Sequence, residues 1–160
     1  MDNIIKYFAG EKLQCTIGIL LGLAGIGLSI YFIYQSKPVL KGIAFAFIPL
    51  SFLLLAICIG IVVRTPKDIQ RVSSYYESKP SKMQTEELPR MEKVMKTFPV
   101  IKTIEIGFIV VGIFLLLFFR GNGIITGVGT GLILQGIMLY GFDHFAQSRG
   151  KIYFEFLNSL

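Results

Sequence analysis

Four long stretches without a charged residue follow one another along the chain. They cover residues 13–36, 42–63, 106–119 and 121–142. An α-helix rises about 1.5 Å per residue and the hydrocarbon core of a bilayer is about 30 Å thick, so about 20 apolar residues cross it. Three of the stretches reach that length, and the third along the chain reaches it if its helix begins near Pro99. The pattern predicts four membrane-spanning helices.

The predicted spans cover approximately residues 13–35, 41–64, 99–119 and 123–143. We expect an all-α integral membrane protein that forms a single domain over residues 1–160. Its four transmembrane helices should form two hairpins. A cytoplasmic connector with short amphipathic helices, residues 65–98, should join the hairpins.

Residues outside the spans are expected to form short helices that lie in the membrane interface or against the bundle. Residues 1–12 and 85–98 both alternate apolar and charged positions in a helical pattern. A threonine followed by a proline begins residues 65–76, which is typical of a helix N-terminus. The Lys-Pro pair within residues 78–81 predicts a loop. Pro99 is expected to open the third span.

The distribution of basic residues predicts the orientation. The chain has 16 lysines and arginines and a net charge of +6. Only Lys37, Lys41 and Arg120 adjoin the span ends that face away from the connector. By the positive-inside rule, the connector and both ends of the chain should be cytoplasmic, in the inner (plasma) membrane. Anionic lipid attracts such juxtamembrane cations, so the basic charge does not indicate a nucleic-acid partner.

Small residues recur at helical spacing in two of the spans. They are Gly18, Gly22 and Gly25 in the first span and Gly123, Gly127 and Gly131 in the fourth. Small residues let helices approach closely, and van der Waals packing drives helix association in lipid. One interpretation is that the first and fourth spans pack on each other within one chain. The other is an oligomer interface or a set of helices around a pore.

Five ionisable residues are expected near the inner membrane boundary, at the ends of the last three spans. They are Arg64, Lys102, Glu105, Asp143 and His144. Such a cluster can bind a polar ligand or hold a catalytic proton. It can equally form an ion-pair belt that ties the helices together. No nucleophile stands at a recognisable spacing from the histidine, and no glycine-rich phosphate loop follows a strand, so no catalytic residue is assigned.

Two cysteines, Cys15 and Cys58, lie toward the predicted inner side. A reducing compartment argues against a structural disulfide there. Two thiols without further soft ligands do not make a metal site, so neither a metal nor a cofactor is expected.

A possible docking surface occurs in the connector. Tyr75, Tyr76 and the methionines Met83, Met91 and Met95 can form an adaptable surface for a partner. The alternative is that these side chains are buried against the underside of the bundle.

From these patterns we expect a small inner-membrane protein that acts by protein–protein binding and has no enzymatic activity. An immunity-like or accessory protein for a membrane-active toxin or membrane complex fits this description. Its partners would be the lipid bilayer and either another protein or further copies of the chain. The first alternative is a homo-oligomeric pore or carrier for a small solute. The second is a small membrane enzyme with a polar site at the inner boundary.

Overall fold

The computed structural model describes residues 1–160 and consists of helices and short turns. Its elements are α1 (Asp2–Tyr34), α2 (Pro38–Ser78), α3 (Pro80–Lys82), the π-helical turn η1 (Met83–Glu87), α4 (Leu88–Phe118) and α5 (Gly123–Asn158). Four helical segments are long and apolar enough to cross a membrane: α1, α2, the run from α3 through α4, and α5. The prediction of an all-helical protein with four such helices is therefore confirmed.

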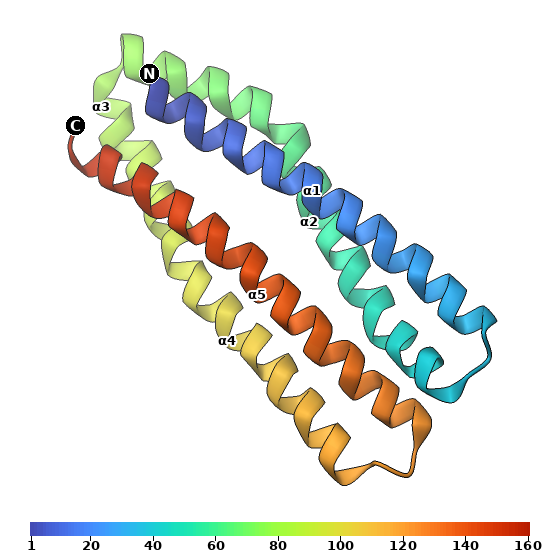
Figure 1. Cartoon of the computed structure of the whole chain (residues 1–160). Coiled ribbons are helices and arrows are strands. Elements are labelled where there is room, and N and C mark those ends of the chain that lie inside the picture. The colour runs from blue at the N-terminus through green and yellow to red at the C-terminus, as the bar shows by residue number, and fades with distance from the viewer.

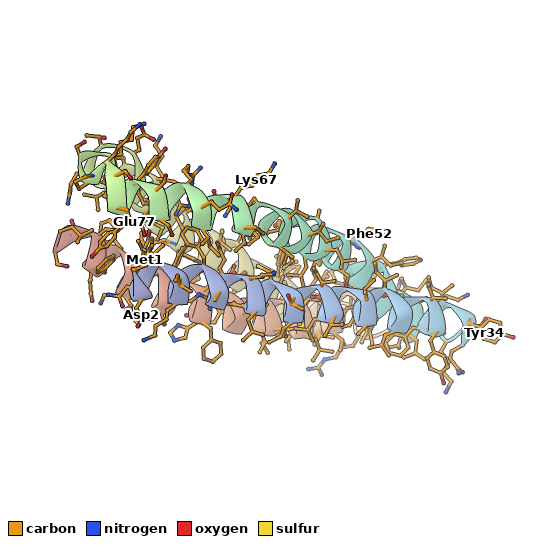
Figure 2. The ribbon with its side chains drawn as sticks, turned by 90° about the horizontal axis from the view of Figure 1, so that it is seen from above. Met1, Asp2, Tyr34, Phe52, Lys67 and Glu77 are labelled. Carbon is orange, nitrogen blue, oxygen red and sulfur yellow. The ribbon has the colours of Figure 1, made fainter.

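The four long helices lie lengthwise along one another (Figure 1). α1 packs against α2, α4 packs against α5, and α2 also packs on α5. Both ends of the chain and α3 lie at one end of the bundle, and the turns that follow α1 and α4 lie at the other (Figure 1). Figure 2 shows the same arrangement of the two ends, because Tyr34 lies at the opposite end of the molecule from Met1 and Asp2.

The helices are longer than the predicted spans. α2 has 41 residues, so it is about 60 Å long, about twice the thickness of a bilayer core. The charge-free segments occupy the half of the bundle near the two turns, and most lysines and arginines occupy the half near the chain ends. Lys67 projects outward from α2 in this charged half (Figure 2). A bilayer around the charge-free half leaves the charged half beyond the hydrocarbon.

The prediction of short helices and a loop in the connector is wrong. α2 continues without a break through Pro66, and Lys79 is the single non-helical residue between α2 and α3. The Thr65 side chain does not cap a new helix, because its hydroxyl donates to the Ile61 carbonyl at 2.7 Å. α4 likewise continues through Pro99, so this proline does not open a span.

Tertiary packing explains why these helices continue through prolines. A buried cluster near the chain ends, here called the terminal cluster, consists of Ile4, Tyr7, Phe8, Val72, Met83, Met91, Tyr153 and Leu157. Burying each large apolar side chain contributes about 1.5–3 kcal/mol, which offsets the roughly 3 kcal/mol cost of an internal proline. The rings of Tyr7 and Tyr153 stack with their centroids 4.3 Å apart. Residues 1–12 therefore belong to α1 and are not a separate interfacial segment.

A buried ion pair lies beside the terminal cluster. The Glu87 carboxylate is 1% exposed and receives two hydrogen bonds from Arg90, at 2.6 and 2.9 Å. The Tyr153 hydroxyl donates to the same carboxylate at 3.2 Å. A buried charge is tolerated only when it is paired and hydrogen-bonded. These bonds therefore fix the π-helical turn against α5.

Candidate functional site

The glycines predicted for helix packing in α1 lie against α2. They are Gly18, Gly22 and Gly25, and all three are buried. A Cβ added at Gly22 would lie 2.7 Å from Leu55 Cγ, and one at Gly18 would lie 2.6 Å from Cys58 Sγ. Gly18 also faces the Phe142 ring of α5. Only glycine leaves room for these neighbours.

The glycines predicted for α5 also lie against α2. A Cβ at Gly127 would lie 2.8 Å from Gly42 Cα, and one at Gly131 would lie 2.8 Å from Ala46 Cβ. A Cβ at Gly123 would meet the ring of Pro38, the first residue of α2, at 3.0 Å. α2 thus lies between the two glycine-rich helices α1 and α5. The glycine face of α1 and the glycine face of α5 do not pack directly on each other. These close approaches all occur within one chain.

The five ionisable residues predicted near the inner boundary separate into two groups. Arg64, Glu105 and Asp143 line one cavity, whereas Lys102 and His144 do not. The Lys102 ammonium donates to the Gln147 side-chain oxygen at 2.5 Å and lies 3.5 Å from His144 Nδ1. His144 is exposed. The predicted cluster is therefore not one site.

The cavity lies between α2 and α4 and is here called the lateral cavity. Its volume is about 390 Å³, and 16 of its 22 lining residues are hydrophobic. Leu53 and Ile57 of α2 and Ile104 of α4 line it and are 57%, 53% and 53% exposed. Because these residues are exposed, the cavity opens sideways between the two helices. A bilayer around the charge-free half would face this opening.

On α2 and α5 the lining changes from apolar to charged toward the chain ends, whereas on α4 apolar residues line the cavity on both sides of Glu105. On α2 the lining runs from Leu50 to Ile61 without a charge, over about 16 Å. Arg64 follows at the end of the cavity nearer the chain ends. On α5 the apolar Leu139 precedes Asp143. A ligand with an apolar body and one polar end matches this gradient.

Three polar lining residues were not among the predicted site residues. They are Glu11 and Gln14 of α1 and Arg149 of α5. The Arg149 guanidinium donates to the Gln14 side-chain oxygen at 2.6 Å. The Glu11 carboxylate lies 3.4 Å from the Arg64 guanidinium. Both contacts join helices that are distant in sequence, so they stabilise the charged end of the cavity.

Glu105 and Asp143 form a carboxyl pair in the lateral cavity. Glu105 is 3% exposed, and its Oε2 atom has no hydrogen-bond partner. Asp143 of α5 lines the same cavity as Glu105. Two carboxyl groups in one cavity are stabilised by a proton or a cation near them, because two negative charges repel. The pair can therefore receive a donor from a ligand.

The two cysteines also line the lateral cavity. Cys15 of α1 is 4% exposed and Cys58 of α2 is 1% exposed, and both are free thiols. Both cysteines belong to one small buried cluster with Leu54. Sequence spacing gave no indication of this cluster, because the residues lie on different helices.

The predicted docking surface in the connector is partly buried. Met83 and Met91 belong to the terminal cluster and are 2% and 0% exposed. The Tyr75 hydroxyl donates to Glu86 at 2.7 Å. Tyr76 is 37% exposed. These residues therefore match the alternative of burial against the bundle better than that of an open surface.

Comparisons with protein-family models, with curated proteins and with solved structures give no match to this chain.

Proposed function

We propose that this protein binds a membrane-soluble amphiphile in the lateral cavity. The apolar body of the ligand lies between α2 and α4, and its polar end lies at the charged end. The observation that carries the proposal is an apolar cavity, open at the side, whose wall carries the unpartnered, buried carboxyl oxygen of Glu105. A buried polar atom without a partner is costly, and a ligand that pairs with it removes that cost.

The size of the cavity supports a small ligand. Its volume of about 390 Å³ falls in the range of roughly 300–1,000 Å³ that is usual for small-molecule sites. Such sites are mostly apolar, with a few polar groups that orient the ligand. A helix of a partner protein, about 10 Å across, is too large for this space.

We place the charged half in the cytoplasm and the charge-free half in the inner membrane. The positive-inside rule supports this orientation, because only three of the 16 lysines and arginines lie at the turn end. α1 with α2, and α4 with α5, then form two hairpins whose connector is cytoplasmic. The charged end of the lateral cavity would lie near the inner head groups.

The protein–protein binding function expected from the sequence stays a prediction, and so do the pore and the membrane enzyme. Of the three methionines that suggested a docking surface, Met83 and Met91 are buried and Met95 is partly exposed, and the glycines that suggested an oligomeric pore pack within one chain. Neither set of residues therefore favours these functions over amphiphile binding. The histidine that suggested a catalytic role, His144, lies outside the cavity.

The proposal is tested by photolabelling of the full chain in phosphatidylcholine nanodiscs. The probe is a fatty alcohol with a diazirine in its chain, and the labelled positions are mapped by mass spectrometry. Labelling should concentrate on cavity residues such as Leu54, which is only 6% exposed. Ile57→Trp should fill the opening and reduce this labelling strongly. Ile59→Trp is the matched control, because Ile59 is exposed on the same helix and does not line the cavity.

A probe that binds only as bulk lipid would label outward-facing residues and spare Leu54. That pattern, or equal labelling of the Ile57→Trp and Ile59→Trp variants, would contradict amphiphile binding in the lateral cavity.

A further inference from the structure

We propose that the polar end of the bound amphiphile is a cationic amine, held by the carboxyl groups of Glu105 and Asp143. This inference rests on the proposed function and adds the chemical class of the ligand.

Glu105 supplies the first argument, because its position is unusual for a carboxyl group. Its side chain is buried to 3% exposure, lines the lateral cavity and leaves one oxygen without a partner. A carboxylate accepts hydrogen bonds and does not donate them. The missing partner is therefore a donor, and a positively charged donor binds a carboxylate most strongly.

The second argument is the placement of Asp143 beside Glu105. Both carboxyl groups lie on the wall of the same cavity. A primary ammonium group has three N–H donors. It can therefore bind both carboxyl groups at once and separate their charges.

The third argument is that neither arginine of the cavity lining pairs with these two carboxyl groups. Arg64 lies 3.4 Å from the Glu11 carboxylate and 3.6 Å from that of Asp68. Arg149 donates to Gln14, and its buried Nε atom has no partner. Neither arginine shows a hydrogen bond or ion pair to the carboxyl pair.

Lys102 is the remaining cation near Glu105, and it lies outside the cavity lining. Its ammonium donates to Gln147 and lies 5.3 Å from the centre of the Tyr140 ring. It reduces the repulsion within the carboxyl pair from a distance but makes no hydrogen bond to either carboxyl group. The site therefore still has room for a cation from a ligand.

An anionic head group fits this site less well. It would add a negative charge beside the carboxyl groups of Glu105 and Asp143. Like charges at close range are unfavourable, and more so where water is scarce. A neutral hydroxyl can donate one hydrogen bond but brings no charge. The expected order of affinity is amine, then alcohol, then carboxylate.

The test compares three probes with the same alkyl chain: dodecylamine, dodecan-1-ol and dodecanoate. Each competes with the diazirine alcohol for labelling of Leu54 in phosphatidylcholine nanodiscs at neutral pH. Concentrations are expressed as mole fractions measured in the bilayer, so that different partitioning does not distort the comparison. Dodecylamine should compete at a mole fraction about tenfold or more below that of dodecan-1-ol, the gain expected for a charge-assisted hydrogen bond.

The variants Glu105→Gln and Asp143→Asn should each remove most of this preference, so that dodecylamine and dodecan-1-ol compete at similar mole fractions. Glu92→Gln is the matched control, because Glu92 is an exposed carboxylate on the same helix that pairs with Lys96. This variant should keep the full preference for the amine. Asp143→Asn provides a second variant in case the change at the more deeply buried Glu105 prevents folding.

Equal competition by dodecylamine and dodecan-1-ol in the unaltered chain would overturn the amine inference and leave amphiphile binding intact. Retention of the preference in both variants would also overturn it, because the carboxyl pair would then not be the receptor. If the diazirine alcohol does not label Leu54 at all, the proposed function fails and the amine inference fails with it.

Discussion

Replacing Gly127 by alanine should push α5 away from α2 and destabilise the bundle. The added methyl group would meet the Val39 backbone carbonyl and lie 2.8 Å from Gly42 Cα. Carbon atoms in good contact lie about 3.5–4.0 Å apart, so the helices must separate by about 1 Å. The obstacle is backbone on both sides and cannot be relieved by rotating a side chain.

The size of the effect follows from two opposing contributions. An alanine in a helix is favoured over glycine by about 0.5–1 kcal/mol. Overpacking a close contact costs about 1–3 kcal/mol or more. The variant should therefore lose about 1–2 kcal/mol, which lowers the melting temperature by about 4 °C for a chain of this size.

Gly141→Ala is the matched control. Gly141 lies on the same helix, and a Cβ added there meets nothing within 4 Å. This variant keeps the propensity gain without the collision, so it should melt at or slightly above the unaltered chain.

The assay uses the two buried cysteines, which react with a thiol-reactive fluorescent dye only when the helices separate. Thermal unfolding in detergent micelles is followed by the rise in fluorescence. If Gly127→Ala melts at the same temperature as Gly141→Ala, the close crossing of α2 and α5 does not exist as described.

Three further outcomes are expected. Mild oxidation should join Cys15 to Cys58 in one chain, because both cysteines belong to one buried cluster; loss of maleimide labelling under denaturing conditions measures this. Glu87→Gln should lower stability by about 2 kcal/mol or more in thermal unfolding, because it removes the charge from a buried ion pair. Hydrogen bonds from Lys82 and Tyr75 hold the pKa of Glu86 below its ordinary value, so this contact stabilises the fold above the ordinary glutamate pKa. The stabilisation is lost as the pH falls through the lowered pKa, which melting temperatures at several pH values test.

For each of these three predictions, a specific result would contradict it. Two thiols that stay free after oxidation would mean that α1 and α2 are in a different register. A Glu87→Gln variant as stable as the exposed-site variant Glu92→Gln would mean that the buried pair contributes little. If Glu86→Gln shows the same acid-induced loss of melting temperature as the unaltered chain, other carboxylates cause that loss.

The four spanning helices could be predicted because hydropathy and length directly limit what crosses a bilayer. The helix boundaries outside the spans could not. Thr65-Pro66 and Pro99 carry local signals for a helix start, but α2 and α4 continue through them to the terminal cluster, which buries Val72 and Met91. A local signal of this kind cannot report packing with α1 and α5.

One available signal was missed in α1. Its buried positions Ile4, Phe8, Cys15, Gly18 and Gly22 recur at helical spacing across the expected boundary of the span. That continuity predicts a single helix from the first residues onward. It would also have placed Glu11 and Gln14 on the inward face, beside the cysteine.

The sequence could not show that the five predicted ionisable residues separate into two groups. Helical spacing places Lys102 and Glu105 on neighbouring sides of α4. It does not tell which side faces the cavity, because that depends on where α2 and α5 lie. The structure places Glu105 in the lateral cavity and Lys102 beside Gln147, outside it.

The account depends most directly on whether an amphiphile enters the space between α2 and α4. Magnetisation transfer from the alkyl chain of dodecylamine to protein methyl groups, in nanodiscs of deuterated lipid, measures this contact. The account predicts transfer to Leu54 and Leu139, which line the cavity, at dodecylamine levels where the outward-facing Ile113 receives little. Equal transfer to Ile113 and none to Leu54 and Leu139 would contradict it.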